Sequence, residues 1–120
     1  MGVDLRLLPL DYEGPDITYS HTILSMERQR ELWPKIEALP STPAPRFTSF
    51  MAIREAEPDK GESCYGYATK DAYGQPLRCV TADDLRKCVM RLVGLYEKNY
   101  AIGCYLSALP PETRIVLYWH

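Results

Sequence analysis

The sequence has few of the residues and patterns that usually mark a reactive centre. Its 120 residues include two histidines and four cysteines, with no Cys-x-x-Cys pair and no histidine pair at zinc spacing. No Gly-x-Gly-x-x-Gly, Walker, Gly-x-Ser-x-Gly or His-Glu-x-x-His pattern occurs either. We therefore expect no metal and no cofactor. We favour a non-catalytic protein, although a chain without these motifs can still be an enzyme.

The sequence also lacks an excess of one charge and any long apolar run. Its formal net charge is -2, whereas binding to a phosphate backbone or an anionic membrane favours a clear basic excess. The opening residues, MGVDLRLLPL, have neither the basic flank nor the long apolar stretch of a secretory signal. We therefore expect a cytoplasmic protein with reduced cysteines that binds neither nucleic acid nor membrane.

What is present is the composition of an ordinary globular domain. Hydrophobic residues make up 46% of the chain and charged residues 25%, values typical of a folded protein. A chain of this length is expected to bury one core. We predict a single α+β domain over residues 1–120, with a mostly antiparallel sheet of four to five strands and two to three helices on one face.

Alternating apolar and polar residues predict several of these strands. The first covers residues 3–10 and should end at Pro9, which cannot donate to a ladder. A second begins at Ile17 and alternates through Ile23, and it could pair with the first. A third is predicted over 47–53 from its aromatic content. The continuous apolar run of 114–120 predicts a strand buried on both faces in the middle of the sheet.

Capping residues predict where the helices begin. Ser25 is a favourable N-cap for a helix over 26–39, which should stop near Leu32 or kink at Pro34. Thr81, followed three residues later by an aspartate, forms a capping-box-like start for a helix whose apolar spacing runs to Tyr96.

A further short helix is predicted near the C-terminus. Asn99 is its expected N-cap, and the apolar residues from Ile102 to Leu109 repeat at helical spacing. Pro110 and Pro111 should end it.

The stretch SCYGYATKDAYGQPLRCVT, residues 63–81, predicts a hairpin with a turn at residues 70–73. In that register Cys64 lies opposite Cys79 and Tyr65 opposite Arg78. Asp71 and Gly74 supply the turn, because aspartate can accept hydrogen bonds from the backbone of its own turn and glycine adopts positive φ freely.

This hairpin is also the candidate protein-binding surface. Tyrosine offers a large contact area at low entropic cost and is enriched at interface hot spots. The candidate residues are Tyr65, Tyr67, Lys70, Asp71 and Tyr73. An equally weighted interpretation has Tyr65 and Tyr67 buried against the helix that starts at Thr81, since aromatic residues at alternate strand positions usually face a core.

An alternative function is binding of a small molecule or nucleotide, with or without catalysis. Its pocket would lie between the sheet and the helices and use His21, Tyr67 and Arg78. A cysteine nucleophile would need His21 or His120 as its base, and a strand histidine with a satisfied hydrogen bond is the simpler interpretation of His21.

Three stretches resemble small uncharacterised proteins of tailed bacteriophages and prophages. They are GVDLRLLPL at the start, YGYATKDAYGQPL in the centre and YLSALPPETRIVLYWH at the end. The resemblance implies an accessory role in the cytoplasm of a bacterial host, with a host or phage protein as the partner. It implies no catalytic residue.

Overall fold

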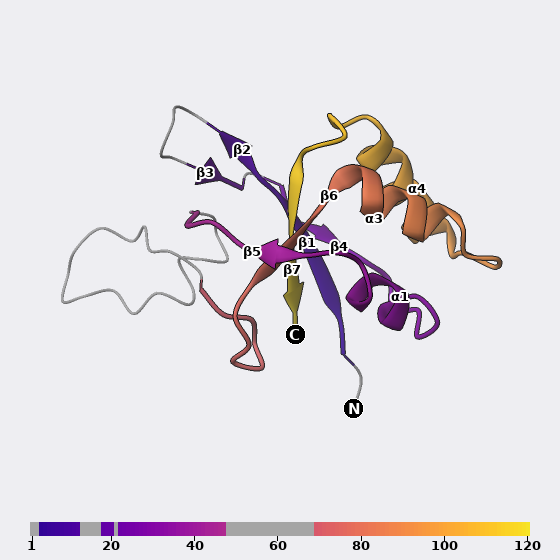
Figure 1. The fold of residues 1–120 in the computed structure, drawn as a ribbon. Coiled ribbons are helices and arrows are strands. Elements are labelled where there is room, and N and C mark those ends of the chain that lie inside the picture. Colours follow the sequence, from indigo (N-terminus) through magenta and orange to yellow (C-terminus); the bar gives the residue numbers. More distant parts are fainter. Residues whose placement is uncertain (1–2, 13–17, 21, 48–68) are drawn as a thin grey trace.

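A five-stranded antiparallel sheet forms the centre of the molecule (Figure 1). The computed structural model describes residues 3–12, 18–20, 22–47 and 69–120. The strand order is β4-β1-β7-β6-β5, and a separate two-stranded ribbon pairs β2 with β3. The strands are β1 (Leu5–Pro9), β2 (Asp11–Tyr12), β3 (Thr18–Tyr19), β4 (Leu24–Ser25), β5 (Thr42–Pro43), β6 (Arg78–Thr81) and β7 (Arg114–Trp119).

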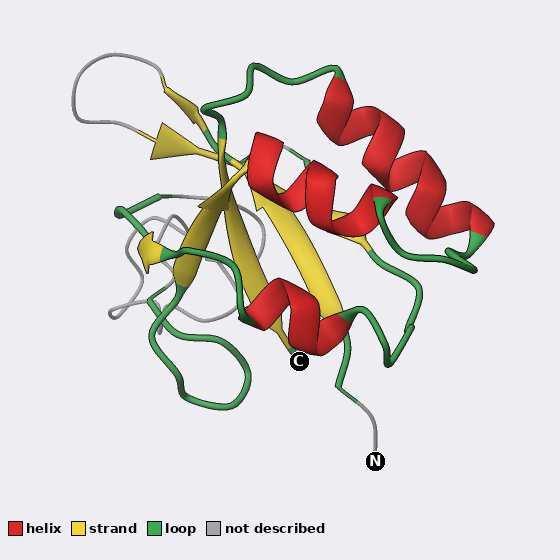
Figure 2. Cartoon of the chain, turned by 45° about the vertical axis from the view of Figure 1, so that its right-hand side comes forward, coloured by secondary structure: helices red, strands yellow, loops and turns green. Residues whose placement is uncertain are grey.

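In the described part of the chain, three helices cover one face of this sheet (Figure 2). They are α1 (Trp33–Glu37), α3 (Ala82–Met90) and α4 (Glu97–Ser107). Their apolar side chains share a core with residues of β1, β6 and β7. The predicted α+β fold, with an antiparallel sheet and helices on one face, is confirmed. Of the helices described, none is long and apolar enough to cross a lipid bilayer.

The last strand, β7, is the central strand of the sheet, as its apolar run predicts. It pairs with β1 on one side and β6 on the other. Ile115 and Leu117 join the core beneath the helices. Val116 and Tyr118 point to the opposite face and belong to a second apolar cluster with Phe47 and others. A strand buried on both faces needs apolar residues at successive positions, which explains the continuous run.

Helix α3 begins as its capping residues predict. Thr81 has extended backbone angles, and its side-chain oxygen accepts a hydrogen bond from the backbone N–H of Asp84 at 3.2 Å. The helix is shorter than predicted, because it ends at Met90 and not near Tyr96. Gly94, with a φ of 80°, lies in the connection to α4, a backbone conformation that glycine adopts without strain.

The helix predicted to begin at Ser25 is wrong over its first half. Ser25 belongs to β4, and the next N–H, that of Met26, donates to the Leu5 carbonyl at 3.1 Å. The helix begins only at Trp33, with Pro34 in its first turn. A proline there sacrifices no helical hydrogen bond, because the first N–H groups have no partner inside the helix. Pro34 therefore starts a helix where it was expected to break one.

Asn99 is not an N-cap, and this prediction is also wrong. Tyr96 takes the N-cap position of α4, and Asn99 lies fully buried in its first turn. Its Oδ1 accepts from the Glu27 backbone N–H at 2.8 Å, and its Nδ2 donates to the Glu27 carbonyl at 2.9 Å. The same Nδ2 donates to Gln29 Oε1 at 3.1 Å. The Asn99 side chain thus engages both the N–H and the carbonyl of Glu27, and these groups are not available for the hydrogen bonds of a helix.

The other predicted strands are partly visible. The alternating stretch from Ile17 to Ile23 contains β3, which pairs with β2 and not with β1. The partner of β1 on that side is β4, which begins at Leu24. Within the alternating stretch, Ile17 and His21 lie outside the described residues. Of the strand predicted over 47–53, only Phe47 is described, and it is buried outside any strand.

Replacing Asn99 with alanine should destabilise the fold by about 2–4 kcal/mol. The substitution leaves the Glu27 N–H and carbonyl without their side-chain partner and removes one of the two hydrogen bonds that Gln29 Oε1 accepts. Each unsatisfied buried polar group costs about 1–3 kcal/mol. Urea denaturation followed by tryptophan fluorescence measures the change. Lys98→Ala, at the exposed neighbouring position, is the matched control. Equal midpoints for the two variants would contradict the role assigned to Asn99.

The sheet also ties together the two ends of the described chain. Asp4 and His120 exchange backbone hydrogen bonds at 2.9 Å in both directions, and the Asp4 carboxylate accepts two hydrogen bonds from Arg28 at 3.0 and 2.9 Å. The His120 ring lies 6.1 Å from that of Tyr118, centroid to centroid. Burial lowers the pKa of His120, and the positive charge of Arg6 lowers it further, while Asp4 opposes the shift.

This lowered pKa predicts a loss of stability on mild acidification. As the pH falls below about 6.5, the unfolded chain takes up a proton on His120 before the folded chain does. The free energy of unfolding should therefore decrease through this range until the folded-state pKa is passed. His120→Gln should flatten the pH dependence of the melting temperature between about pH 7 and 5. An unchanged slope in the variant would show that His120 does not contribute.

Candidate functional site

The predicted turn is present and uses the predicted residues. The Asp71 carbonyl accepts from the Gly74 N–H at 3.1 Å, and Gly74 has a φ of 80°. Asp71 Oδ1 accepts from the backbone N–H groups of Tyr73 at 2.8 Å and Gln75 at 3.0 Å. Aspartate and glycine therefore do supply the turn chemistry.

The predicted ladder beyond the turn is wrong. Cys79 lies opposite Thr42 of β5 on one side and Val116 of β7 on the other. A strand has two hydrogen-bonding edges, so Cys64 cannot be the ladder partner of Cys79. The Cys79 thiol instead lies 3.3 Å from the Thr42 hydroxyl.

The same reason excludes the pair of Tyr65 with Arg78. Arg78 lies opposite Pro43 and Leu117. A hairpin is the simplest interpretation of neighbouring sequence, but residues 42–43, distant along the chain, occupy that edge of β6. The register near the turn is also shifted, since Lys70 forms a bridge with Pro76.

The structure places part of the predicted binding surface. Lys70 is exposed, Asp71 is half-buried, and 52% of the Tyr73 surface is exposed. Tyr65 and Tyr67 lie outside the described residues, so both interpretations of these two tyrosines stay predictions. Of the three residues of the alternative pocket, His21 and Tyr67 also lie outside the described residues. The third, Arg78, is described.

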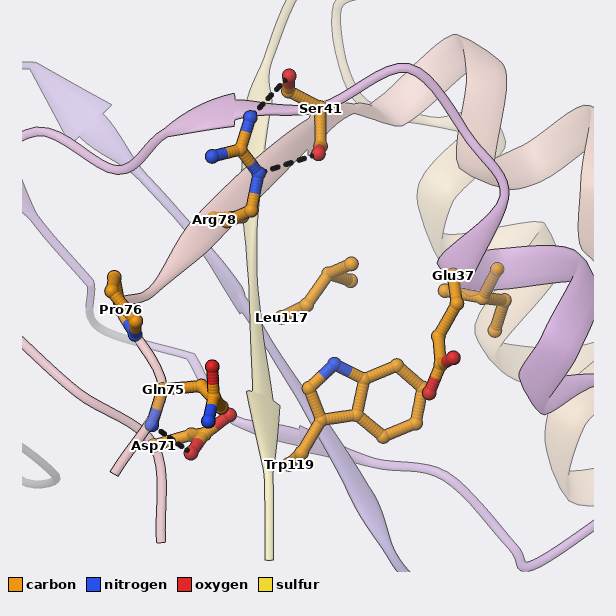
Figure 3. Close-up of a pocket in the computed structure, with 9 residues that line it drawn as sticks. Glu37, Ser41, Asp71, Gln75, Pro76, Arg78, Leu117 and Trp119 are labelled. Carbon is orange, nitrogen blue, oxygen red and sulfur yellow. Dashed lines mark hydrogen bonds between the residues drawn. The ribbon is translucent and has the colours of Figure 1, made fainter. Parts of the chain in front are cut away.

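That third residue, Arg78, lines a groove beside the hairpin (Figure 3). We call it the hairpin groove. Its volume is about 460 Å³. It lies on the helical face of the sheet, next to α1. Its lining residues come from α1, the segment that leads to β5, the hairpin, β6 and β7, and they are Ile36, Glu37, Ser41, Asp71, Gln75, Pro76, Arg78, Leu117 and Trp119.

The floor of the groove follows from strand register. Arg78 of β6 lies opposite Leu117 of β7, and Trp119 follows two positions later on the same face. The Trp119 ring packs edge-to-face on Trp33 at the start of α1, with ring centroids 5.9 Å apart. Since α1 has only five residues, it covers this end of the sheet incompletely, and the indole remains part of an open surface.

Arg78 is held in place without neutralisation of its charge. Its Nε donates to Ser41 Oγ at 2.8 Å, and its Nη2 donates to the Ser41 carbonyl, also at 2.8 Å. Both acceptors are uncharged, and no carboxylate is found to pair with Arg78 in the described ranges. Glu37 and Asp71 lie on other sides of the groove (Figure 3). The groove thus presents separated positive and negative groups around an aromatic floor.

Sequence reasoning identified Arg78 and Asp71 but missed Glu37, Ser41 and Trp119. Trp119 was interpreted as part of a buried strand, and its half-exposure results from the short helix above it. Glu37 and Ser41 carry no motif. The one signal that could have indicated this opening is Pro34, because a proline at a helix start implies a helix that begins late.

Two of the three described cysteines, Cys79 and Cys88, offer little for nucleophilic chemistry, and the third, Cys104, is exposed. Cys79 is buried, and burial raises the pKa of the Cys88 thiol, which disfavours the reactive thiolate. No group of three or more metal-ligating side chains occurs in the parts of the chain that the structure describes. What the hairpin groove offers is recognition, through a fixed guanidinium, an indole and two carboxylates.

Comparisons of the chain with models of protein families, with curated proteins and with solved structures give no match.

Proposed function

We propose that this chain is a non-catalytic binding protein that engages another protein. Its contact surface combines the hairpin groove with the adjoining hairpin tip, residues 70–75. The observation that carries the proposal is Tyr73. Its side chain is half-exposed, and hydrogen bonds hold the backbone of its turn in one conformation. The resemblance to phage and prophage proteins favours a host or phage protein as the partner.

The tip is held in one conformation by several independent hydrogen bonds. The Asp71 side chain fixes the N–H groups of Tyr73 and Gln75. The Asp71 N–H donates to the Gln75 carbonyl at 2.9 Å, and the Ala72 N–H donates to the Trp119 carbonyl at 3.1 Å. This last bond anchors the tip to the central strand. A surface ordered before binding loses less conformational entropy when a partner docks.

The exposed side chains of the tip suit a protein contact. Tyr73 combines an apolar ring with a hydroxyl, which is typical of residues that dominate interface energies. Lys70 adds a charge at the rim, where charges affect association rate and specificity more than affinity. A turn that served only to connect two strands would need neither side chain.

The groove also favours the alternative, a small-molecule binding site. It lies between the sheet and a helix and contains Arg78, as that hypothesis required. Its volume of about 460 Å³ falls within the usual range for ligand sites, about 300–1,000 Å³. A metabolite that copurifies with the chain and is detected by native mass spectrometry would favour this alternative.

The double substitution Lys70→Ala with Tyr73→Ala should abolish capture of the partner and leave the fold intact. Lys70 is exposed and Tyr73 is half-exposed, so the loss of stability should be small, about 1 kcal/mol. The measurement is quantitative mass spectrometry of proteins retained on the immobilised chain from lysate of its own host, compared between wild type and variant.

Tyr100→Ala provides a matched control, because 54% of the Tyr100 surface is exposed and it lies on α4, away from the hairpin. This variant should retain the partners that the tip variant loses. Retention of every partner by the tip variant would show that the hairpin is scaffold and that binding occurs elsewhere.

A further inference from the structure

The hairpin groove has two ends of opposite charge. Arg78 lies at one end, with the free edge of its guanidinium turned away from Trp119 and with Leu117 between the two residues (Figure 3). At the other end the Trp119 indole lies between Glu37 and Asp71 (Figure 3). We call this the indole end of the groove. Two carboxylates and one guanidinium give the lining a formal charge of -1, and the negative charge is concentrated at the indole end.

The indole itself is held in place from two sides. Its edge-to-face contact with Trp33 has a centroid distance of 5.9 Å and an interplanar angle of 82°. The Trp119 carbonyl accepts from the Ala72 N–H at 3.1 Å, which ties the hairpin to the strand that carries the indole. Trp119 nevertheless stays only partly buried and lines the groove. An indole face attracts cations more strongly than the face of any other aromatic side chain.

The two carboxylates at the indole end are not used in ion pairs. Among the residues that the structure describes, neither Glu37 nor Asp71 pairs with a basic side chain. Asp71 Oδ1 accepts from the N–H groups of Tyr73 and Gln75, which fixes the orientation of this carboxylate. Because the groove is open to solvent, neither group requires a partner, and a single exposed ion pair would contribute little. A useful site arises because two carboxylates and an indole can act on the same cation.

A guanidinium fits this arrangement better than an ammonium. It is planar, and its N–H donors lie in that plane around its rim. A guanidinium lying flat on the Trp119 indole therefore directs N–H groups sideways, toward Glu37 on one side and Asp71 on the other (Figure 3). An ammonium is a compact point charge with no flat face to stack on a ring.

The position of Arg78 determines which way a bound cation points. Arg78 lies opposite Leu117 on the neighbouring strand, and alternate positions of a strand are about 7 Å apart. Its positive charge repels a second cation from that end of the groove and leaves the indole end as the favourable position. The aliphatic part of a long basic side chain then lies over Leu117, which is the apolar surface between the two ends.

We infer that the indole end of the hairpin groove binds an arginine side chain of the partner protein. The guanidinium lies on Trp119 between Glu37 and Asp71. This inference rests on the proposed function, because it specifies the chemistry of the partner at the same surface. Asp71 belongs to both the hairpin tip and the groove, so a partner seated on Tyr73 lies next to this site.

The test uses acetyl-argininamide and its neutral isostere acetyl-citrullinamide as probes of the full-length chain. The chain has two tryptophans, so a ¹⁵N–¹H correlation spectrum shows two indole signals. The signal of Trp119 should shift saturably with the arginine probe, with a Kd on the order of 1–10 mM. The citrulline probe should bind at least about tenfold more weakly, because it keeps the shape but not the charge. Acetyl-lysinamide should bind about threefold more weakly, because it keeps the charge but not the flat face.

Variants assign the effect to the groove. Glu37→Gln should weaken the arginine probe about fivefold, whereas Glu112→Gln, at an exposed acid that precedes β7, should leave its binding unchanged. Arg78→Gln should strengthen binding about twofold, because it removes a like charge, and damage to the fold would not produce a gain. The Trp33 indole signal should stay in place in all unliganded variants and so reports that each one is folded.

Capture from host lysate tests whether the partner uses this site. Glu37→Lys places a like charge beside the guanidinium and should reduce retention of the proteins captured through the hairpin tip at least about fivefold. Glu112→Lys is the matched control and should retain them. Full retention by Glu37→Lys would show that the partner inserts no arginine here.

Three results with the probes would also overturn the inference. Equal binding of the arginine and citrulline probes would show that the groove recognises no charge. A Trp119 signal that does not move with about 50 mM of the arginine probe, well above the expected Kd, would show that no guanidinium binds. Unblocked arginine binding about tenfold more tightly than the blocked probe would identify an amino-acid site. If capture still depends on Lys70 and Tyr73 in these cases, the proposed function stands while the groove inference fails.

Discussion

The hydrogen bonds between the Asn99 side chain and the Glu27 backbone hold the segment between β4 and α1 against α4. One buried amide satisfies the N–H and the carbonyl of a residue 72 positions earlier in the chain. It thereby keeps the segment after β4 extended, because a residue whose N–H and carbonyl are both engaged by a side chain cannot join a helical ladder. Helix formation is delayed until Trp33, and α1 is limited to five residues. The hairpin groove lies beside this short helix, where Trp119 is only partly buried.

Gln29 extends this polar contact to the connection between α3 and α4. Its Nε2 donates to the Gly94 carbonyl at 2.9 Å, and its Oε1 accepts from the Tyr96 N–H at 3.2 Å. The N-cap residue of α4 thus receives its hydrogen-bond partner from a distant segment. A network whose members are all satisfied fixes one arrangement of the surrounding elements, since any shift would leave buried polar atoms without partners. The position of α4 on the sheet and the late start of α1 therefore depend on the same few bonds.

The parts of the fold that could be predicted are those fixed by neighbouring residues. The cap at Thr81, the turn at Asp71 and Gly74, and the central position of β7 each depend on local hydrogen bonding or on a continuous apolar run. The wrong predictions share a different cause. Ser25 and Asn99 are both good N-cap residues, but distant partners on β1 and at Glu27 determined their roles. The strand that pairs with the outer edge of β6 is formed by residues 42–43. No local sequence pattern indicates that these residues pair with β6.

The candidate site shows the same division. Arg78 and Asp71 could be singled out as charged residues near a turn, and Tyr73 as an exposed aromatic. The groove itself could not be predicted, because it depends on the absence of helix above Trp119. Such a gap arises from the tertiary position of α1, and Pro34 indicates only that the helix begins late.

The pairing of β1 with β7 has a consequence for how the chain folds during synthesis. This is the longest pairing in the sheet, and it joins residues 5–9 to residues 115–119. The central strand therefore leaves the ribosome after β1 and β6, which have no shared neighbour until it does. Contacts so far apart in sequence form slowly, because the long segment between them must close into a loop. Until then the apolar edges of β1 and β6 stay unpaired, and a nascent chain stalled before residue 114 would need protection by a chaperone.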